Sequence, residues 1–93
     1  MADLTETFAG GSIGAGTVKH GTGLHSGLYT FTKAAQNDTV TLGDFSTVSF
    51  VAPQFTSTGT ADTYTISSTT TNEVTLTGST TGAMRALVYG VKA

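Results

Sequence analysis

The feature that most constrains the fold of this chain is a two-residue alternation of apolar and hydroxyl side chains from residue 28 onward. Successive side chains of a β-strand point to opposite faces of its sheet, so this period is typical of strands with one buried and one exposed face. In residues 28–33, Tyr29 and Phe31 share one face and threonines share the other. Because no stretch shows apolar residues at helical spacing, we expect an all-β chain.

The same alternation recurs along the rest of the chain. It predicts strands at residues 28–33, 39–42, 45–52, 62–67, 72–77 and 83–91. About six strands at this spacing predict a small antiparallel β-sandwich or barrel, and the pattern leaves the strand order open. The last run is apolar on both faces, which predicts either a central strand or pairing at a subunit interface.

The run from Phe45 to Ala52 carries two finer expectations. Val48 and Phe50 are expected to face the same side, because they are two residues apart. Pro53 is expected to end the strand, because proline cannot donate a hydrogen bond to a ladder. Residues 54–61 are therefore expected to form a loop.

Residues 1–27 differ from the rest, since they hold seven of the twelve glycines. We expect them to form a flexible, extended, glycine-rich N-terminal arm, followed by a β-sandwich domain at residues 28–93. Residues 17–20 are expected to form a short strand within the arm. Its apolar side chains occur singly, a spacing that suits an arm laid along a neighbouring subunit. They are Leu4, Phe8, Ile13, Val18 and Leu24.

The composition excludes several classes of protein. Charged residues make up 11% of the chain, against about 25% in a typical domain, while 21 Thr and 8 Ser supply much of the polar surface. The chain has four basic residues (Lys and Arg together) and six acidic ones (Asp and Glu together). It therefore cannot provide the cationic surface that nucleic acids require. No run approaches the ~20 apolar residues of a membrane helix. With little charge to keep copies apart and a small core, the chain is expected to be a homo-oligomer.

Residues that could carry chemistry are present without the partners they need. His20 and His25 lack a nearby third ligand, so no metal is expected. Asp38, Asp44 and Asp62 fit turn positions better than a calcium loop. The glycines at 10–16 lack the flanking strand, helix and lysine of a phosphate-binding loop, and no nucleophile motif is present. We therefore expect no enzyme activity and no cofactor.

Two further residues are candidates for contacts with other subunits. Phe55 lies beyond Pro53 among Thr and Ser, so it is expected to be exposed and to mark a contact surface. Arg85 is the only arginine and lies in the most apolar run, which favours a pairing with Asp or Glu across a subunit contact. The candidate assembly contacts are Leu4, Phe8, Ile13, Val18, Phe55 and Arg85.

Four segments carry a resemblance to a known group of proteins. They are Asp38–Gly43, Val48–Pro53, Asn72–Thr77 and Leu87–Val91. Together with the preceding glycine-rich stretch, they resemble small β-sandwich virion proteins of tailed viruses of bacteria and archaea, including capsid decoration (cement) proteins. The resemblance covers roughly residues 28–92 and carries over no catalytic residues.

This resemblance implies a structural virion protein that binds and stabilises the viral shell through an oligomeric β-sandwich. Its partners would be the major capsid protein or neighbouring virion subunits, with no nucleic acid and no membrane. The first residues show no basic and apolar segments of a secretory signal. Synthesis in the host cytoplasm and residence in the virion are therefore expected.

Two alternatives belong to other classes. A carbohydrate- or receptor-binding β-sandwich module would use an exposed aromatic platform, for which Phe55, Tyr29 and Tyr64 are the candidates. A subunit of a surface filament would assemble by strand donation through the N-terminal arm.

Overall fold

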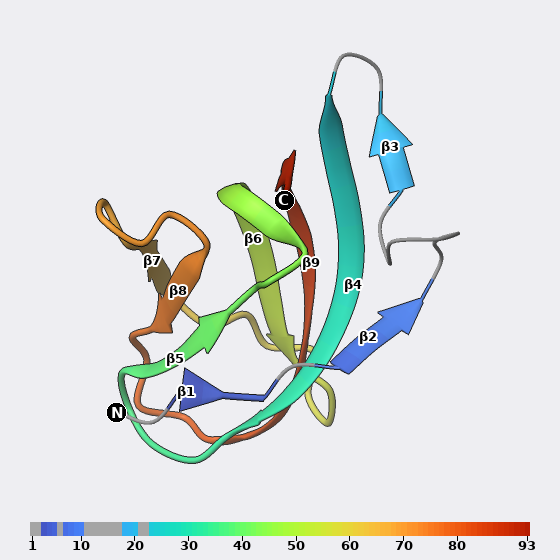
Figure 1. Cartoon of the computed structure of the whole chain (residues 1–93). Helices are drawn as coiled ribbons and strands as arrows, with labels where there is room; N and C mark the ends of the chain where they lie inside the picture. Colours follow the sequence, from blue (N-terminus) through green and yellow to red (C-terminus); the bar gives the residue numbers. More distant parts are fainter. Residues whose placement is uncertain (1–2, 6, 11–17, 21–22) are drawn as a thin grey trace.

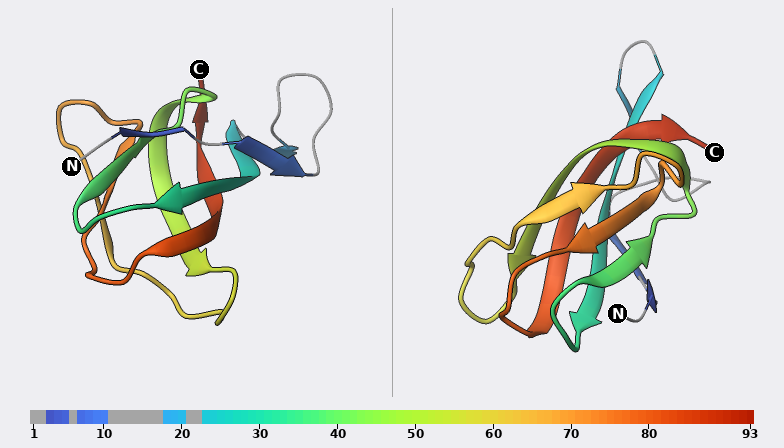
Figure 2. Two further views of the ribbon diagram at one scale, coloured as in Figure 1. Left: turned by 90° about the horizontal axis from the view of Figure 1, so that it is seen from below. Right: turned by 90° about the vertical axis from the view of Figure 1, so that its left-hand side faces the viewer.

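A computed structural model shows an all-β fold with two facing sheets (Figures 1 and 2). It describes residues 3–5, 7–10, 18–20 and 23–93. Six antiparallel strands form two three-stranded sheets, β5–β8–β7 and β4–β9–β6. Their bounds are β4 Leu24–Lys33, β5 Asp38–Thr41, β6 Phe45–Phe55, β7 Tyr64–Ile66, β8 Glu73–Leu76 and β9 Gly82–Lys92. The prediction of a small antiparallel β-sandwich is confirmed.

Strand β9 lies between β4 and β6, which is the first of the two placements that its apolar character on both faces predicted. The long antiparallel pairing with β4 runs from Leu24 opposite Val91 to Lys33 opposite Gly82. In the other sheet, β7 and β8 form an antiparallel hairpin, and β5 pairs with the other side of β8. The β4–β9–β6 sheet is built from the three longest strands of the fold.

Three short strands come from the region expected to be an arm. Strand β1 (Asp3–Leu4) runs parallel to β5, while β2 (Thr7–Gly10) and β3 (Val18–His20) are both antiparallel to β4. The position of β3 matches the strand expected at residues 17–20. Since β4 begins at Leu24, the predicted boundary after residue 27 falls inside a strand, and the described parts of residues 1–27 pair with both sheets.

The core lies between the sheets and draws on both of them. Tyr29 and Phe31 of β4 are buried, as the alternation predicted. The Tyr29 ring meets Phe45 edge-on, with 6.2 Å between centroids. The buried apolar side chains are Tyr29, Phe31, Val40, Leu42, Phe45, Val48, Val51, Phe55, Val74, Leu76, Met84, Ala86 and Val88. Burial of these side chains supplies the main driving force for folding.

Strand β6 continues through Pro53 to Phe55, so the prediction that proline ends the strand is wrong. β6 is an edge strand, and the Pro53 carbonyl accepts a hydrogen bond from the Asp62 amide at 3.2 Å, on the side away from β9. The missing N–H of Pro53 therefore removes no bond to β9, which is where sheets tolerate proline. The extension also buries Phe55, which is only 4% exposed. The expectation that Phe55 is an exposed contact residue is wrong.

The pairing of β6 with β9 is irregular at two places. The register shifts between Phe45 and Thr47 and again between Val48 and Phe50. An additional residue in one strand reverses the direction of the side chains that follow it. Val48 is therefore buried at 3% exposure, whereas Phe50 is 51% exposed. The expectation that both face the same side is wrong.

Candidate functional site

The outward face of the β4–β9–β6 sheet carries an apolar surface that no described part of the chain covers. Along β9, Met84, Ala86 and Val88 are buried, while Leu87 and Val91 are exposed. We define the outer patch as Leu24, Leu28, Phe50, Ala52, Leu87, Tyr89 and Val91. Its five largest exposed members, Leu24, Leu28, Phe50, Leu87 and Val91, each keep 36 to 51% of their surface accessible.

Strand register places these side chains in adjacent rows. Leu28 and Ala52 lie opposite Leu87, on either side of it. In the next row Phe50 lies opposite Tyr89, with 6.2 Å between the ring centroids and 55° between the ring planes. Leu24 and Val91 are paired further along. The outer patch is therefore continuous and not a scatter of single exposed residues.

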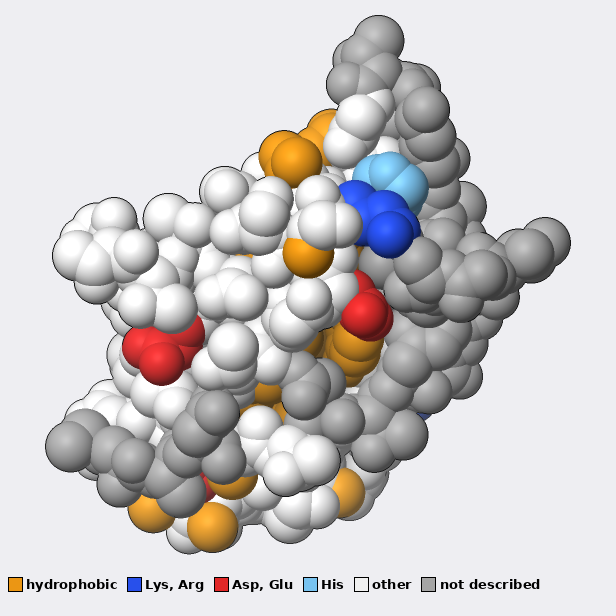
Figure 3. Space-filling view, viewed as in Figure 1, with side chains coloured by type: hydrophobic (Ala, Val, Ile, Leu, Met, Phe, Trp, Pro, Cys, Tyr) orange, Lys and Arg blue, Asp and Glu red, His pale blue; other side chains and the backbone are white. Residues whose placement is uncertain are grey.

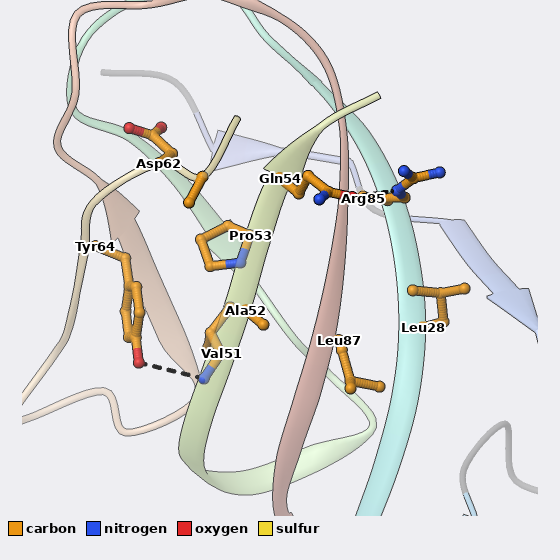
Figure 4. Close-up of a pocket in the computed structure, with 10 residues that line it drawn as sticks. Leu28, Val51, Ala52, Pro53, Gln54, Asp62, Tyr64, Arg85 and Leu87 are labelled. Carbon is orange, nitrogen blue, oxygen red and sulfur yellow. Dashed lines mark hydrogen bonds between the residues drawn. The ribbon is translucent and has the colours of Figure 1, made fainter. Parts of the chain in front are cut away.

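A depression lies on this face, at Ala52 of β6 (Figure 4). It runs from Leu28 and Leu87 across Ala52 to Tyr64, which lies beyond the edge of β6. Because the side chain of Ala52 is only a methyl group, the floor of the depression lies lower than the larger side chains around it. The lining residues are Leu28, Val51, Ala52, Pro53, Gln54, Ala61, Asp62, Tyr64, Arg85 and Leu87.

Arg85 and Gln54 form the polar border of the outer patch. Arg85 Nε donates a hydrogen bond to Gln54 Oε1 at 2.7 Å, and Gln54 Nε2 donates to Gly59 O at 3.0 Å. Arg85 is exposed and adjoins the depression. Its pairing with an acidic residue of another subunit stays a prediction.

The edge of β6 next to the depression is largely covered. Its amide donors find acceptors in neighbouring loops and in the other sheet, and Pro53 has no N–H to offer. The donor and acceptor pairs are Val48 N–H to Thr71 O (2.8 Å), Val51 N–H to Tyr64 Oη (3.4 Å) and Phe55 N–H to Thr60 O (2.8 Å). These bonds protect the edge against the addition of a further strand.

The structure places the six predicted contact residues in different environments. Leu4 packs against the core of its own chain, and Phe55 is buried in it. Phe8 and Val18 lie on β2 and β3, of which only the backbone is described, and Ile13 lies outside the described residues. Of the three whose side chains are described, only Arg85 adjoins the outer patch.

Of the exposed residues of the outer patch, Leu24 was among those expected to lie along a neighbouring subunit, but none was among the six candidate contacts, and Phe50 was in neither group. The exposure of Leu87 and Val91 could have been inferred, since both belong to the run that is apolar on both faces. The exposure of Phe50 had no such signal, because strict alternation placed Phe50 on the same face as Val48.

A second polar site is closed. The side chain of Lys33 is fully buried, and Nζ donates to Asp62 Oδ2 at 2.6 Å and to Gly78 O at 2.6 Å. Nζ also lies 5.9 Å from the centroid of the Phe55 ring. All of these partners are internal, so this ion pair holds the fold together and offers no surface to a ligand.

Within residues 3–5, 7–10, 18–20 and 23–93, no three His, Cys, Asp or Glu side chains gather as a possible metal site. The described part of the chain also holds no helix long and apolar enough to cross a bilayer. Much of the face seen in Figure 3 is neither hydrophobic nor charged, in keeping with the abundance of Thr and Ser.

Comparison of the chain with protein-family models, curated proteins and solved structures found no match.

Proposed function

We propose that the protein is a structural subunit of a virus particle, a capsid decoration (cement) protein that binds and stabilises the shell. The outer patch is the observation that supports this proposal most directly. Its exposed apolar side chains present on the order of 300–400 Å² to water, a size at which apolar patches commonly mark interaction sites. The patch lies on a hydrogen-bonded sheet, which holds its side chains in fixed positions.

The function proposed here needs binding energy and no reaction. Burial of about 350 Å² of apolar surface contributes roughly 9 kcal/mol at 25 cal/mol per Å². Association itself costs about 4–15 kcal/mol. A single contact of this size therefore gives weak binding, whereas many copies that bind both the shell and one another are retained through avidity. The partners are the major capsid protein or neighbouring virion subunits.

The two alternatives have less support. A carbohydrate-binding module needs an exposed aromatic platform beside polar groups. Tyr29 and Phe55 are buried, and the Tyr64 hydroxyl accepts a hydrogen bond from the Val51 amide. The exposed aromatic is Phe50, whose neighbours in the outer patch are mainly apolar side chains. A filament built by strand donation needs a free sheet edge, and the amides of β6 are covered by neighbouring loops and by Tyr64.

The test is whether the chain copurifies with intact virus particles at a fixed ratio to the major capsid protein. We expect Phe50→Ser to lower that ratio by about tenfold or more, because an exposed aromatic at the centre of a contact contributes strongly to binding. Thr65→Lys, at an exposed position on β7, is the matched control and should leave the ratio unchanged. Absence of the wild-type chain from particles would overturn the proposal, and a specific hit on a glycan array would then favour the carbohydrate-binding alternative.

A further inference from the structure

We infer that the outer patch is covered by a second copy of this chain, in a two-fold dimer whose β4–β9–β6 sheets pack face to face. This inference rests on the proposed function and deepens it: among the partners proposed there, the outer patch takes a neighbouring subunit, a second copy of this chain. It commits to one occupant, because the patch carries both a projecting side chain and a hollow that fits it.

The projection and the hollow are neighbours on one strand. Phe50, 51% exposed, is the most exposed large apolar side chain among the described residues. Ala52, two residues along β6, lies in the depression between Leu87 and the strand edge. Residues two apart on a strand are separated by about 6.7 Å along it. Phe50 and the hollow above Ala52 are therefore about one side-chain row apart.

A two-fold axis would make the outer patches of two copies complementary to each other. The axis would run across the strands, parallel to the sheet and midway between the rows of Phe50 and Ala52. Rotation about it places the partner's Phe50 over Ala52, and Phe50 over the partner's Ala52. Two-fold interfaces require such reciprocal contacts, and sheets packed in this way lie about 10 Å apart with interdigitated side chains.

The chemistry of the patch and its border agrees with a second copy as the occupant. Among the described residues, the charged side chains at this face are Arg85, whose Nε is bonded to Gln54, and Asp62, which lines the depression and is paired with the buried Lys33. The proposed axis brings the partner's Val91 over Arg85, whose aliphatic stem can pack against it while the guanidinium stays at the rim. The two apolar surfaces together bury roughly 700 Å², and the Thr-rich border brings the total toward the 1,200 Å² of a small specific interface.

The direct test is sedimentation velocity of the full chain over a range of concentrations. We expect a monomer–dimer equilibrium in the wild type and a dissociation constant raised about tenfold or more by Phe50→Ser. Ala52→Lys, which fills the hollow, should have the same effect. Both positions are exposed, so circular dichroism should show a folded chain. Thr65→Lys should sediment like the wild type. A wild type that stays monomeric, or Phe50 and Ala52 variants that dimerise normally, would overturn the inference.

Cysteine cross-linking tests the geometry independently, because the chain has no native cysteine. Sheets about 10 Å apart hold opposed cysteines too far apart for a direct disulfide, which needs Cβ atoms about 3.5–4.5 Å apart, so a short bifunctional thiol reagent is used. At high chain concentration, we expect a mixture of Phe50→Cys and Ala52→Cys chains to be cross-linked several times faster than either variant alone. Equal rates in all three samples would exclude the proposed axis.

The outcomes also separate this inference from the proposed function. A chain that dimerises through Phe50 and Ala52 yet never joins particles would refute the decoration role and keep the dimer. A chain that is monomeric in solution but loses particle binding on Phe50→Ser would refute the dimer and keep the decoration role.

Discussion

Lys33 and Asp62 form an ion pair inside the sandwich, with 2.6 Å between Nζ and Oδ2 and side chains only 0% and 4% exposed. Lys33 Nζ also donates to the Gly78 carbonyl at 2.6 Å, and Asp62 Oδ1 accepts from the Thr63 amide at 2.9 Å. The pair therefore ties the end of β4 to the segment before β7 and to the turn before β9. Removal of one partner leaves the other charge buried without compensation, which destabilises more than loss of the whole pair.

We therefore predict that Lys33→Met and Asp62→Asn each lower the free energy of unfolding by about 3–5 kcal/mol. The double variant should lose clearly less than the sum of the two, because neither charge then remains unpaired. Urea denaturation measures all three values. Lys92→Met, at an exposed cation, is the control and should change stability by less than about 0.5 kcal/mol. Strict additivity of the two single losses would show that the charges do not interact.

Gly90 of β9 is paired with Val48 of β6, between the two register shifts of that strand. A Cβ atom there would collide with the Thr47 carbonyl oxygen and lie 3.0 Å from Phe45 Cδ1 and from Val48 Cα. Two of these three atoms are backbone and cannot rotate away. We predict that Gly90→Ala destabilises the fold by about 3 kcal/mol or more, the upper end for overpacking. Gly43→Ala is the control, because a Cβ at Gly43 meets nothing within 4 Å. Equal thermal stability of the two variants would contradict the close approach.

The two-residue alternation predicted the all-β class of the fold, because most of its strands pair without register shifts. Tyr29 and Phe31 in β4, and Val74 and Leu76 in β8, keep strict period two and are buried as expected. In β6 the register shifts break this rule, and no glycine within the strand marks them. The available signal lies on the neighbouring strand, where Gly90 interrupts an otherwise bulky apolar run. An isolated glycine in a strand often marks a bulge or a close backbone approach.

The same irregularity explains why the candidate site was only partly predictable. Leu87 and Val91 follow from the two-sided apolar run, once β9 is known to be central with one uncovered face. The exposure of Phe50 depends on the shift after Val48, a property of the pairing of two strands and not of one strand's sequence. The burial of Phe55 depends on β6 being an edge strand, which made Pro53 tolerable. Strand order, which decides that point, is not encoded in the alternation.

Phe50 and Phe55 lie on the same strand and should respond to mutation in opposite ways. Phe55 is 4% exposed, so we predict that Phe55→Ala lowers the free energy of unfolding by about 3–5 kcal/mol, as buried aromatic truncations do. Phe50→Ala should change it by less than about 1 kcal/mol in the monomer, since half of that side chain is already in water. Urea denaturation at low protein concentration, where self-association does not contribute, gives both values. A larger loss at Phe50 than at Phe55 would contradict the register of β6.

The turn from β4 to β5 depends on a single buried carboxylate. Asp38, 1% exposed, accepts hydrogen bonds at Oδ2 from the amides of Ala34 and Ala35 at 2.8 and 2.9 Å. We predict that Asp38→Ala costs about 2–3 kcal/mol, because both amides lose their acceptor in a partly buried site. Asp38→Asn keeps one acceptor oxygen of similar size and should cost less.

Asn37, with φ of 66°, provides the control next to Asp38. Asn37→Gly should change stability by less than about 0.5 kcal/mol, because glycine adopts this conformation freely. Thermal unfolding followed by circular dichroism distinguishes the three variants. An Asp38→Ala chain as stable as Asn37→Gly would show that the carboxylate does not hold this turn.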